Sequence, residues 1–124
     1  MSQLVTYNAL MGYELEKARK QMGLEQSEVS AKTGISQPVL SRLEKGKASI
    51  TIDQLYVICN ALRIRPEVII TAVSVAVDTF AAEGNVKVTT TKRISSDDTN
   101  TTGAMLTGAA IGSILTLLLN RGNK

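Results

Sequence analysis

The segment over residues 26–46, QSEVSAKTGISQPVLSRLEKG, constrains the fold of this chain more than any other. It predicts two short helices joined by a tight turn. Gly34 supplies the left-handed conformation that ends the first helix, and Ser36 is a good N-cap for the second. Pro38 falls in the first turn of the second helix, where a missing N–H costs little. The segment therefore encodes two crossing helices, the second of which opens with polar side chains.

Apolar residues recur at helical spacing on both sides of this pair. The spacing predicts five helices between residues 8 and 82, which end or begin at Gly23, Gly34, Gly46, Pro66 and Gly84, with Thr51 or Ser49 capping the fourth. Apolar residues nearly encircle the fifth helix, and such a helix needs cover on most sides. We therefore expect a second subunit to pack on it.

The character of the chain changes after Asn85. The stretch VKVTTTKRI alternates β-branched and polar residues and predicts a short strand. The stretch SSDDTNTT reads as a polar linker, and 17 uncharged residues follow over positions 103–119. The fold class is thus mainly all-α, with a helical domain over residues 1–84. Residues 85–124 are expected to form an extension of strand, linker and helix.

A stripe of small residues runs along this last predicted helix. Ala104, Gly108, Gly112 and Thr116 fall four residues apart, which allows another helix to approach closely. One interpretation is a packing helix that caps its own domain or joins a second subunit. The other is a membrane anchor over residues 103–119, just short of the usual ~20 residues. Glycine, threonine and serine offset the apolar gain of insertion, which favours the packing helix.

Charge and composition exclude several function classes. The formal charge is +3, and residues 1–65 carry all of that excess, which suits a polyanionic partner. There is no histidine, and the single Cys59 cannot form an intramolecular disulfide. No catalytic constellation and no metal or cofactor site is visible, so we expect no enzyme. The N-terminus lacks a signal-peptide pattern, and we expect a cytoplasmic protein.

Residue type and spacing agree with one family across four of the predicted helices. The matching positions are Gly12, Leu15, Arg19, Gly23, Leu24, Gln26, Glu28, Gly34, Ile35, Ser36, Ser41, Arg42, Leu43, Glu44, Gly46, Leu55, Ala61, Leu62 and Pro66. On these residues, positions 11–69 resemble the phage-repressor-like (Xre/Cro) helix-turn-helix family. The chain departs from the pattern at Ser30, where alanine is usual, and at Ile50, where proline is common. It also departs at Thr33, where the family usually places a larger aliphatic residue.

The resemblance implies that residues 1–84 are a DNA-binding domain whose helix over residues 37–45 enters the major groove. By motif position, the base contacts would be Gln37, Pro38, Ser41 and Arg42, and the phosphate contacts Gln26, Ser36, Lys45 and Lys47. The resemblance assigns Arg19 and Glu44 to a structural salt bridge between the first and third helices.

The function this implies is a sequence-specific transcriptional regulator of bacterial or phage origin. We expect a homodimeric repressor on double-stranded DNA, because one recognition helix reads only a few base pairs. The strand-like stretch from Val86 could pair across the two-fold axis. One alternative is an antitoxin-type regulator whose residues 85–124 bind a partner protein. Another is a membrane-tethered regulator anchored by residues 103–119.

Overall fold

A computed structural model describes residues 3–83, 85–90, 106 and 108–121 of the chain. The elements are β1 (Gln3–Thr6), α1 (Tyr7–Gln21), α2 (Gln26–Thr33), α3 (Gln37–Glu44), α4 (Ile52–Ala61), α5 (Pro66–Glu83), β2 (Val86–Thr89) and α6 (Gly108–Arg121). The mainly helical fold class is confirmed, and the five expected helices all form. Local chemistry explains their starts, because Thr6, Ser36 and Thr51 each accept a hydrogen bond from the backbone N–H three residues later.

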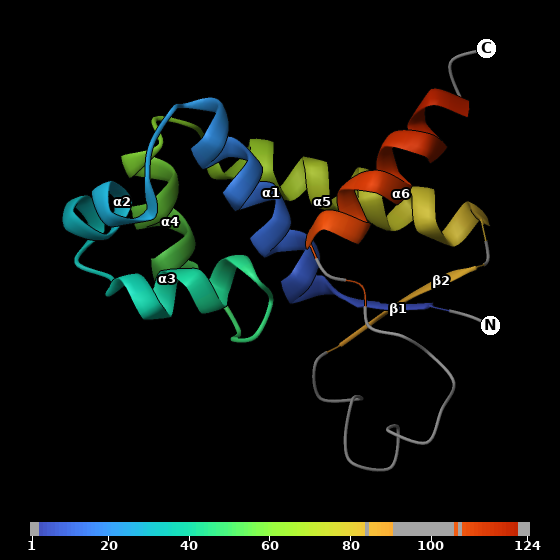
Figure 1. Cartoon of the computed structure of the whole chain (residues 1–124), viewed down its shortest axis with the longest axis horizontal. Helices are drawn as coiled ribbons and strands as arrows, with labels where there is room; N and C mark the ends of the chain where they lie inside the picture. The colour runs from blue at the N-terminus through green and yellow to red at the C-terminus, as the bar shows by residue number, and fades with distance from the viewer. Residues whose placement is uncertain (1–2, 84, 91–105, 107, 122–124) are drawn as a thin grey trace.

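The described residues form two hydrophobic clusters that share the long helices α1 and α5. The first cluster holds α2, α3 and α4 together and runs from Leu15 to Ile69. The second joins the start of α1 and the end of α5 to the two strands and α6. Figure 1 shows this division, with α2, α3 and α4 at one end of the molecule and α6 and the strands at the other. Because α1 and α5 contribute to both clusters, they tie the two ends together.

The second cluster contains a strand that the sequence did not lead us to expect. β1 pairs in parallel with β2, with Gln3 opposite Val86 and Thr6 opposite Thr89. The prediction of a strand over residues 86–94 is thus confirmed for its first four residues; Thr90 lies beyond the end of β2, and residues 91–94 lie outside the described part of the chain. β2 therefore pairs with a strand of its own chain, and β1 occupies one edge of β2.

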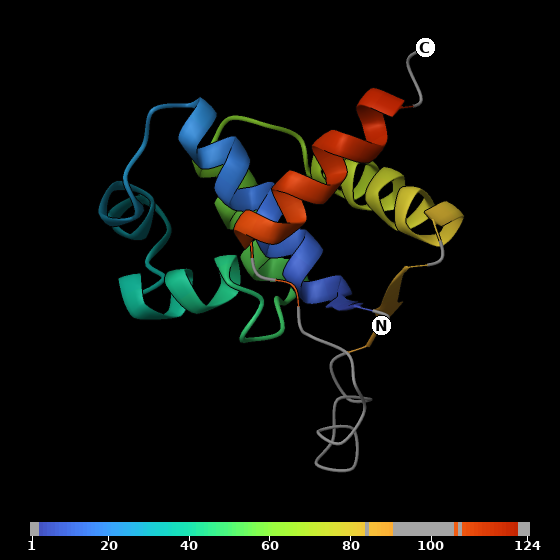
Figure 2. The ribbon, with the colours of Figure 1, turned by 45° about the vertical axis from the view of Figure 1, so that its right-hand side comes forward.

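Helix α6 packs on its own domain. Ile111 and Leu115 are buried in the second cluster, and Gly112 faces Tyr13 of α1. A Cβ atom built on Gly112 would lie 2.9 Å from the Tyr13 hydroxyl, so a small residue allows this close approach. Figures 1 and 2 both place α6 against α1 and α5. Ala104, the first residue of the predicted stripe, lies outside the described residues.

These contacts bear on two further expectations for the C-terminal part of the chain. Residues 85–90 and 108–121 share a cluster with α1 and α5, so the strand and helix of the extension are packed against the helical domain. The boundary at residue 84 stays a prediction. Among the helices that the structure describes, none is both long and apolar enough to cross a bilayer.

The fifth helix is only partly covered by its own chain. Ile69, Val73, Ala76 and Phe80 are buried, as expected for its inner face. Val68, Ile70 and Val75 flank this buried stripe and are exposed, and Tyr56 and Ile52 of α4 are exposed as well. The helix thus has exposed apolar side chains beside its buried stripe, and the second subunit expected to cover them stays a prediction.

Candidate nucleic-acid interface

Helix α3 has two chemically distinct faces. Leu40, Leu43 and Glu44 are buried against the domain. The other face carries Gln37, Pro38 and Arg42, which are exposed, and Ser41, which is half-buried. An α-helix with its side chains is about 10–12 Å across, which matches the ~12 Å width of the DNA major groove. All four residues predicted to contact bases therefore lie on α3 and can reach solvent together.

The turn between α2 and α3 is held by side chains as well as by glycine. Gly34 has φ of 76° and ψ of 0°, in the left-handed region where a side chain is unfavourable. The Ser30 hydroxyl donates to the carbonyl of Ile35 at 2.6 Å, and the Thr33 hydroxyl accepts from the N–H of Ile35 at 3.2 Å. Two of the three departures from the family pattern, Ser30 and Thr33, thus supply hydrogen bonds that fix the direction in which α3 leaves the turn.

A close approach of backbones fixes α3 against α1. A Cβ atom added to Gly12 would lie 2.2 Å from the carbonyl oxygen of Leu43 and 2.6 Å from that of Glu44. No side chain fits into that space, so the glycine sets how near the two helices can come. The position of α3, and of any side chain it presents, depends on this contact.

Arg19 and Glu44 form a buried ion pair at the centre of the domain. Arg19 Nε lies 2.8 Å from Glu44 Oε2, and Arg19 Nη2 lies 3.0 Å from Glu44 Oε1. The two residues are 7 % and 3 % exposed. The hydrogen bonding of Arg19 to the Glu44 carboxylate, which accepts, raises the pKa of Arg19 further above its ordinary value. The pair joins α1 to the end of α3 in a two-pronged geometry that fixes orientation as well as distance.

Two more groups complete this network. Arg19 Nη1 donates to the carbonyl of Leu24 at 2.8 Å, and Gln26 Nε2 donates to Glu44 Oε1 at 2.9 Å. Gln26, the first residue of α2, therefore uses one of its two amide protons inside the protein. Its second amide proton remains available to donate to a phosphate oxygen. Nothing in the sequence pattern pointed to this bond.

The other three residues predicted to contact phosphates flank α3. Ser36 precedes the helix and accepts from the N–H of Val39 at 3.4 Å, so its own hydroxyl proton is available to donate. Lys45 and Lys47 follow the helix and are exposed. The structure thus places Ser36 at one end of α3 and the two lysines at the other, with Gln26 on the neighbouring α2.

Two features of this surface were missed at the sequence level. Val39, in the first turn of α3, is exposed although it is aliphatic. Glu25 is the N-cap of α2 and forms a capping box with Glu28, whose carboxylate accepts from the Glu25 N–H at 3.0 Å. The signal for this capping box was the pair of acidic residues Glu25 and Glu28, three positions apart at the start of α2. Solvent exposure of Val39 has no such local signal.

Comparison with known proteins adds to this geometry. The helix-turn-helix family model matches residues 15–69. An uncharacterised HTH-type transcriptional regulator of Sinorhizobium fredii, y4dJ, is 42 % identical over 53 residues, which cover 43 % of this chain and 69 % of that protein. The residues that the family model matches span the first hydrophobic cluster, which also runs from Leu15 to Ile69.

Solved structures share the fold at lower identity. The clp gene regulator ClgR from C. glutamicum has a TM-score of 0.54 at 22 % identity, over 55 % of this chain and 88 % of that one. A mutant of the restriction-modification controller protein C.Esp1396I has a TM-score of 0.52 at 19 % identity, over 54 % and 89 %. The shared fold covers about half of the chain, and the family match ends at residue 69, before β2 and α6.

Proposed function

The chain belongs to the helix-turn-helix family of DNA-binding transcriptional regulators, and from that premise we propose that α3 reads the major groove as part of a homodimeric repressor. The observation that carries the proposal is the exposed polar face of α3, opposite a face that is fully packed. Repression would follow from occlusion of a promoter by the bound dimer. No bond is made or broken, so the mechanism needs no catalytic group.

Base readout is assigned to the exposed face of α3. Arg42 can donate two hydrogen bonds to guanine, and Gln37 can pair in the same two-pronged way with adenine. Pro38 has no donor and offers apolar contact to a thymine methyl group. Ser41 can donate to either kind of base, and Val39 adds a second apolar contact beside Pro38. The helix would therefore read a short mixed sequence.

Phosphate contacts are assigned to residues around this helix. Gln26 and Ser36 lie before the reading helix on the chain, and Lys45 and Lys47 lie after it. Such contacts set register and orientation and make binding depend on salt. We expect affinity to fall steeply as salt rises, because the two lysines release counterions when they bind.

The dimer is assigned to the exposed apolar face of α4 and α5. Ile52, Tyr56 and Val68 are 69 %, 57 % and 58 % exposed, although each is large and apolar or aromatic. A second copy is a natural cover for this face, and two copies could present their α3 helices to half-sites about 34 Å apart. Analytical ultracentrifugation tests this: a Val68→Glu/Ile52→Glu double variant should sediment as a monomer where the parent is a dimer.

The test of base readout compares two arginines. Selection of bound fragments from random DNA gives the preferred site, and titration then measures affinity for that site and for single-base changes. Arg42→Ala should cost roughly 1–3 kcal/mol and relax the preference at one base pair. Arg65→Ala removes the same charge at a position outside α3 and should change neither the affinity nor the base preference. If Arg42→Ala binds every sequence as well as the parent, the assignment of α3 to base readout is wrong.

A second candidate function rests on α6. Leu117 and Leu119 are exposed near the end of that helix, on a part of the chain outside the matched family region. In this alternative, residues 85–124 bind a partner protein, as in antitoxin-type regulators, while α3 still binds DNA. Stoichiometric co-purification of a partner that is lost with a Leu117→Ser/Leu119→Ser variant would support it. Retention of the partner by that variant would count against α6.

A further inference from the structure

A polar hollow lies between the ends of α2 and α4, and no residue of α3 lines it. Its volume is about 340 Å³, and it is lined by Lys32, Thr33, Val57, Asn60, Ala61 and Arg63. Figure 1 shows α2 and α4 side by side at one end of the molecule. Four of the six lining residues are polar, and two of these are cations. Among the described residues that line the hollow there is no carboxylate.

Neither of these cations is neutralised inside the protein. Lys32 and Arg63 are both exposed, and neither makes a salt bridge with any residue in the described ranges. This differs from Arg19, Lys20 and Arg65, each of which has a carboxylate partner within 3 Å. The hollow therefore gathers positive charge that the fold does not use.

Arg63 also adopts a conformation that costs stability. Its φ is 56°, in the left-handed region, and it is alone among the described non-glycine residues in having a positive φ. Its N–H bonds to the carbonyl of Asn60, and the next N–H bonds to that of Cys59, which is the usual end of a helix at a glycine. Glycine would fit here without strain, so the arginine side chain is retained at a cost.

We propose that this hollow binds a small anion that carries a phosphate group. Two cations with no partner suit a dianion, and the planar guanidinium of Arg63 matches phosphate oxygens in a two-pronged way. The Asn60 side chain adds a neutral amide donor, whereas the Thr33 hydroxyl lines the hollow with its proton already donated to the carbonyl of Val29. The carboxyl ends of α2 and α4 oppose an anion with about −0.5 charge each, which leaves roughly +1 in favour of binding. The volume lies at the small end of ligand sites, which fits a compact phosphate ester.

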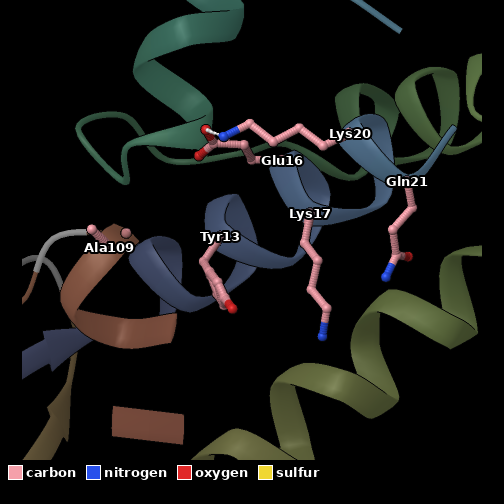
Figure 3. Close-up of a pocket in the computed structure, with 7 residues that line it drawn as sticks. Tyr13, Glu16, Lys17, Lys20, Gln21 and Ala109 are labelled. Carbon is pink, nitrogen blue, oxygen red and sulfur yellow. Dashed lines mark ion pairs between the residues drawn. The ribbon is translucent and has the colours of Figure 1, made fainter. Parts of the chain in front are cut away.

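Another hollow makes a useful contrast. It has a volume of about 520 Å³ between α1 and the start of α6. Figure 3 shows Tyr13 and Lys17 projecting from α1, while Lys20 turns to Glu16, whose Oε1 lies 2.9 Å from its Nζ. A carboxylate thus already neutralises one of its two cations. The hollow between α2 and α4 is instead lined by two cations and by no carboxylate among its described residues.

Thr33 gives the proposed site a direct connection to the turn. Its hydroxyl donates to the carbonyl of Val29 and accepts from the N–H of Ile35. A ligand in the hollow would therefore touch the residue that joins α2 to the segment before α3. The proposal itself concerns ligand binding and does not depend on DNA recognition.

The experiment titrates inorganic phosphate into the full-length protein without DNA, at constant ionic strength, and follows amide resonances by NMR. Saturable shifts are expected at Gly34 and the Asn60 side chain, with a dissociation constant in the millimolar range. Lys32→Gln and Arg63→Gly should each weaken binding about tenfold or more, since each removes a charged hydrogen-bond donor. Lys17→Gln, which removes a lysine elsewhere, should leave binding unchanged.

Arg63→Gly carries a second readout. It should raise the melting temperature while it weakens phosphate binding, because glycine relieves the left-handed strain. Loss of binding in this variant thus cannot be due to unfolding. The proposal is overturned if no shift saturates, or if all four proteins respond alike. It is also overturned if acetate binds as tightly as phosphate, since that would make the hollow a general anion site.

Discussion

The buried Arg19–Glu44 pair gives the sharpest test of how this fold is held together. Arg19→Met keeps most of the side-chain volume and removes three hydrogen bonds, two to Glu44 and one to the carbonyl of Leu24. Glu44 would then be a charge that is 3 % exposed, with Gln26 as its remaining side-chain donor. Breaking one half of a buried pair costs about 3–5 kcal/mol, which is a large share of the stability of a small domain.

The assay is thermal and urea unfolding followed by circular dichroism. For a chain of this size, 3–5 kcal/mol corresponds to a fall in melting temperature of roughly 12–20 °C. The Arg19→Met/Glu44→Met double variant should be at least about 2 kcal/mol more stable than Arg19→Met alone, because it removes the unpaired carboxylate. The double-mutant cycle therefore measures the coupling between the two residues.

The chain contains a matched control. Arg65 Nε lies 2.7 Å from Glu67 Oε2, so the chemistry and distance resemble those of the buried pair, but the two side chains are 82 % and 61 % exposed. Arg65→Met should leave the melting temperature unchanged within error, because water already screens that pair. If Arg65→Met lowers it as much as Arg19→Met does, burial is not the cause. A cost below about 1 kcal/mol for Arg19→Met would equally refute the reasoning.

Three further predictions follow from single contacts. Gly12→Ala should destabilise the protein by roughly 3 kcal/mol or more and weaken DNA binding, because its Cβ would overlap the carbonyl of Leu43; unfolding and DNA titration measure both. Burial raises the pKa of the Cys59 thiol from 9.0 to about 11. The folded state therefore favours the neutral thiol, and this stabilisation is complete below pH 9 and is lost as pH rises toward 11. Cys59→Ala should have a flatter stability curve over that range, and equal slopes would contradict the assigned cause. Gly112→Leu should push α6 away from Tyr13 and speed hydrogen exchange in α6, while α2, α3 and α4 keep their protection.

The helix-turn-helix part could be predicted closely because its signals are local. Gly34 ends α2, and Ser36 caps α3. Each acts on backbone groups within a few residues, so the local sequence alone predicts the turn and the helix start. The exposed face of α3 followed from the same spacing, since Leu40 and Leu43 had to point inward. The residues assigned to DNA could be placed on a surface in this way, whereas their base and phosphate contacts await the binding experiments.

The sequence by itself therefore determined the five helices, the Ser36 cap and the polar face of α3, because each depends on residues that are close together in the chain. Only the tertiary structure decided what packs against the far end of the domain. β1 pairs with a strand some 80 residues away, and α6 lies on Tyr13 of α1. Only the folded chain brings Lys32 beside Arg63 and Gln26 beside Glu44. Such contacts depend on which surfaces meet. No local sequence pattern identifies the partner of a short strand or of an exposed cation.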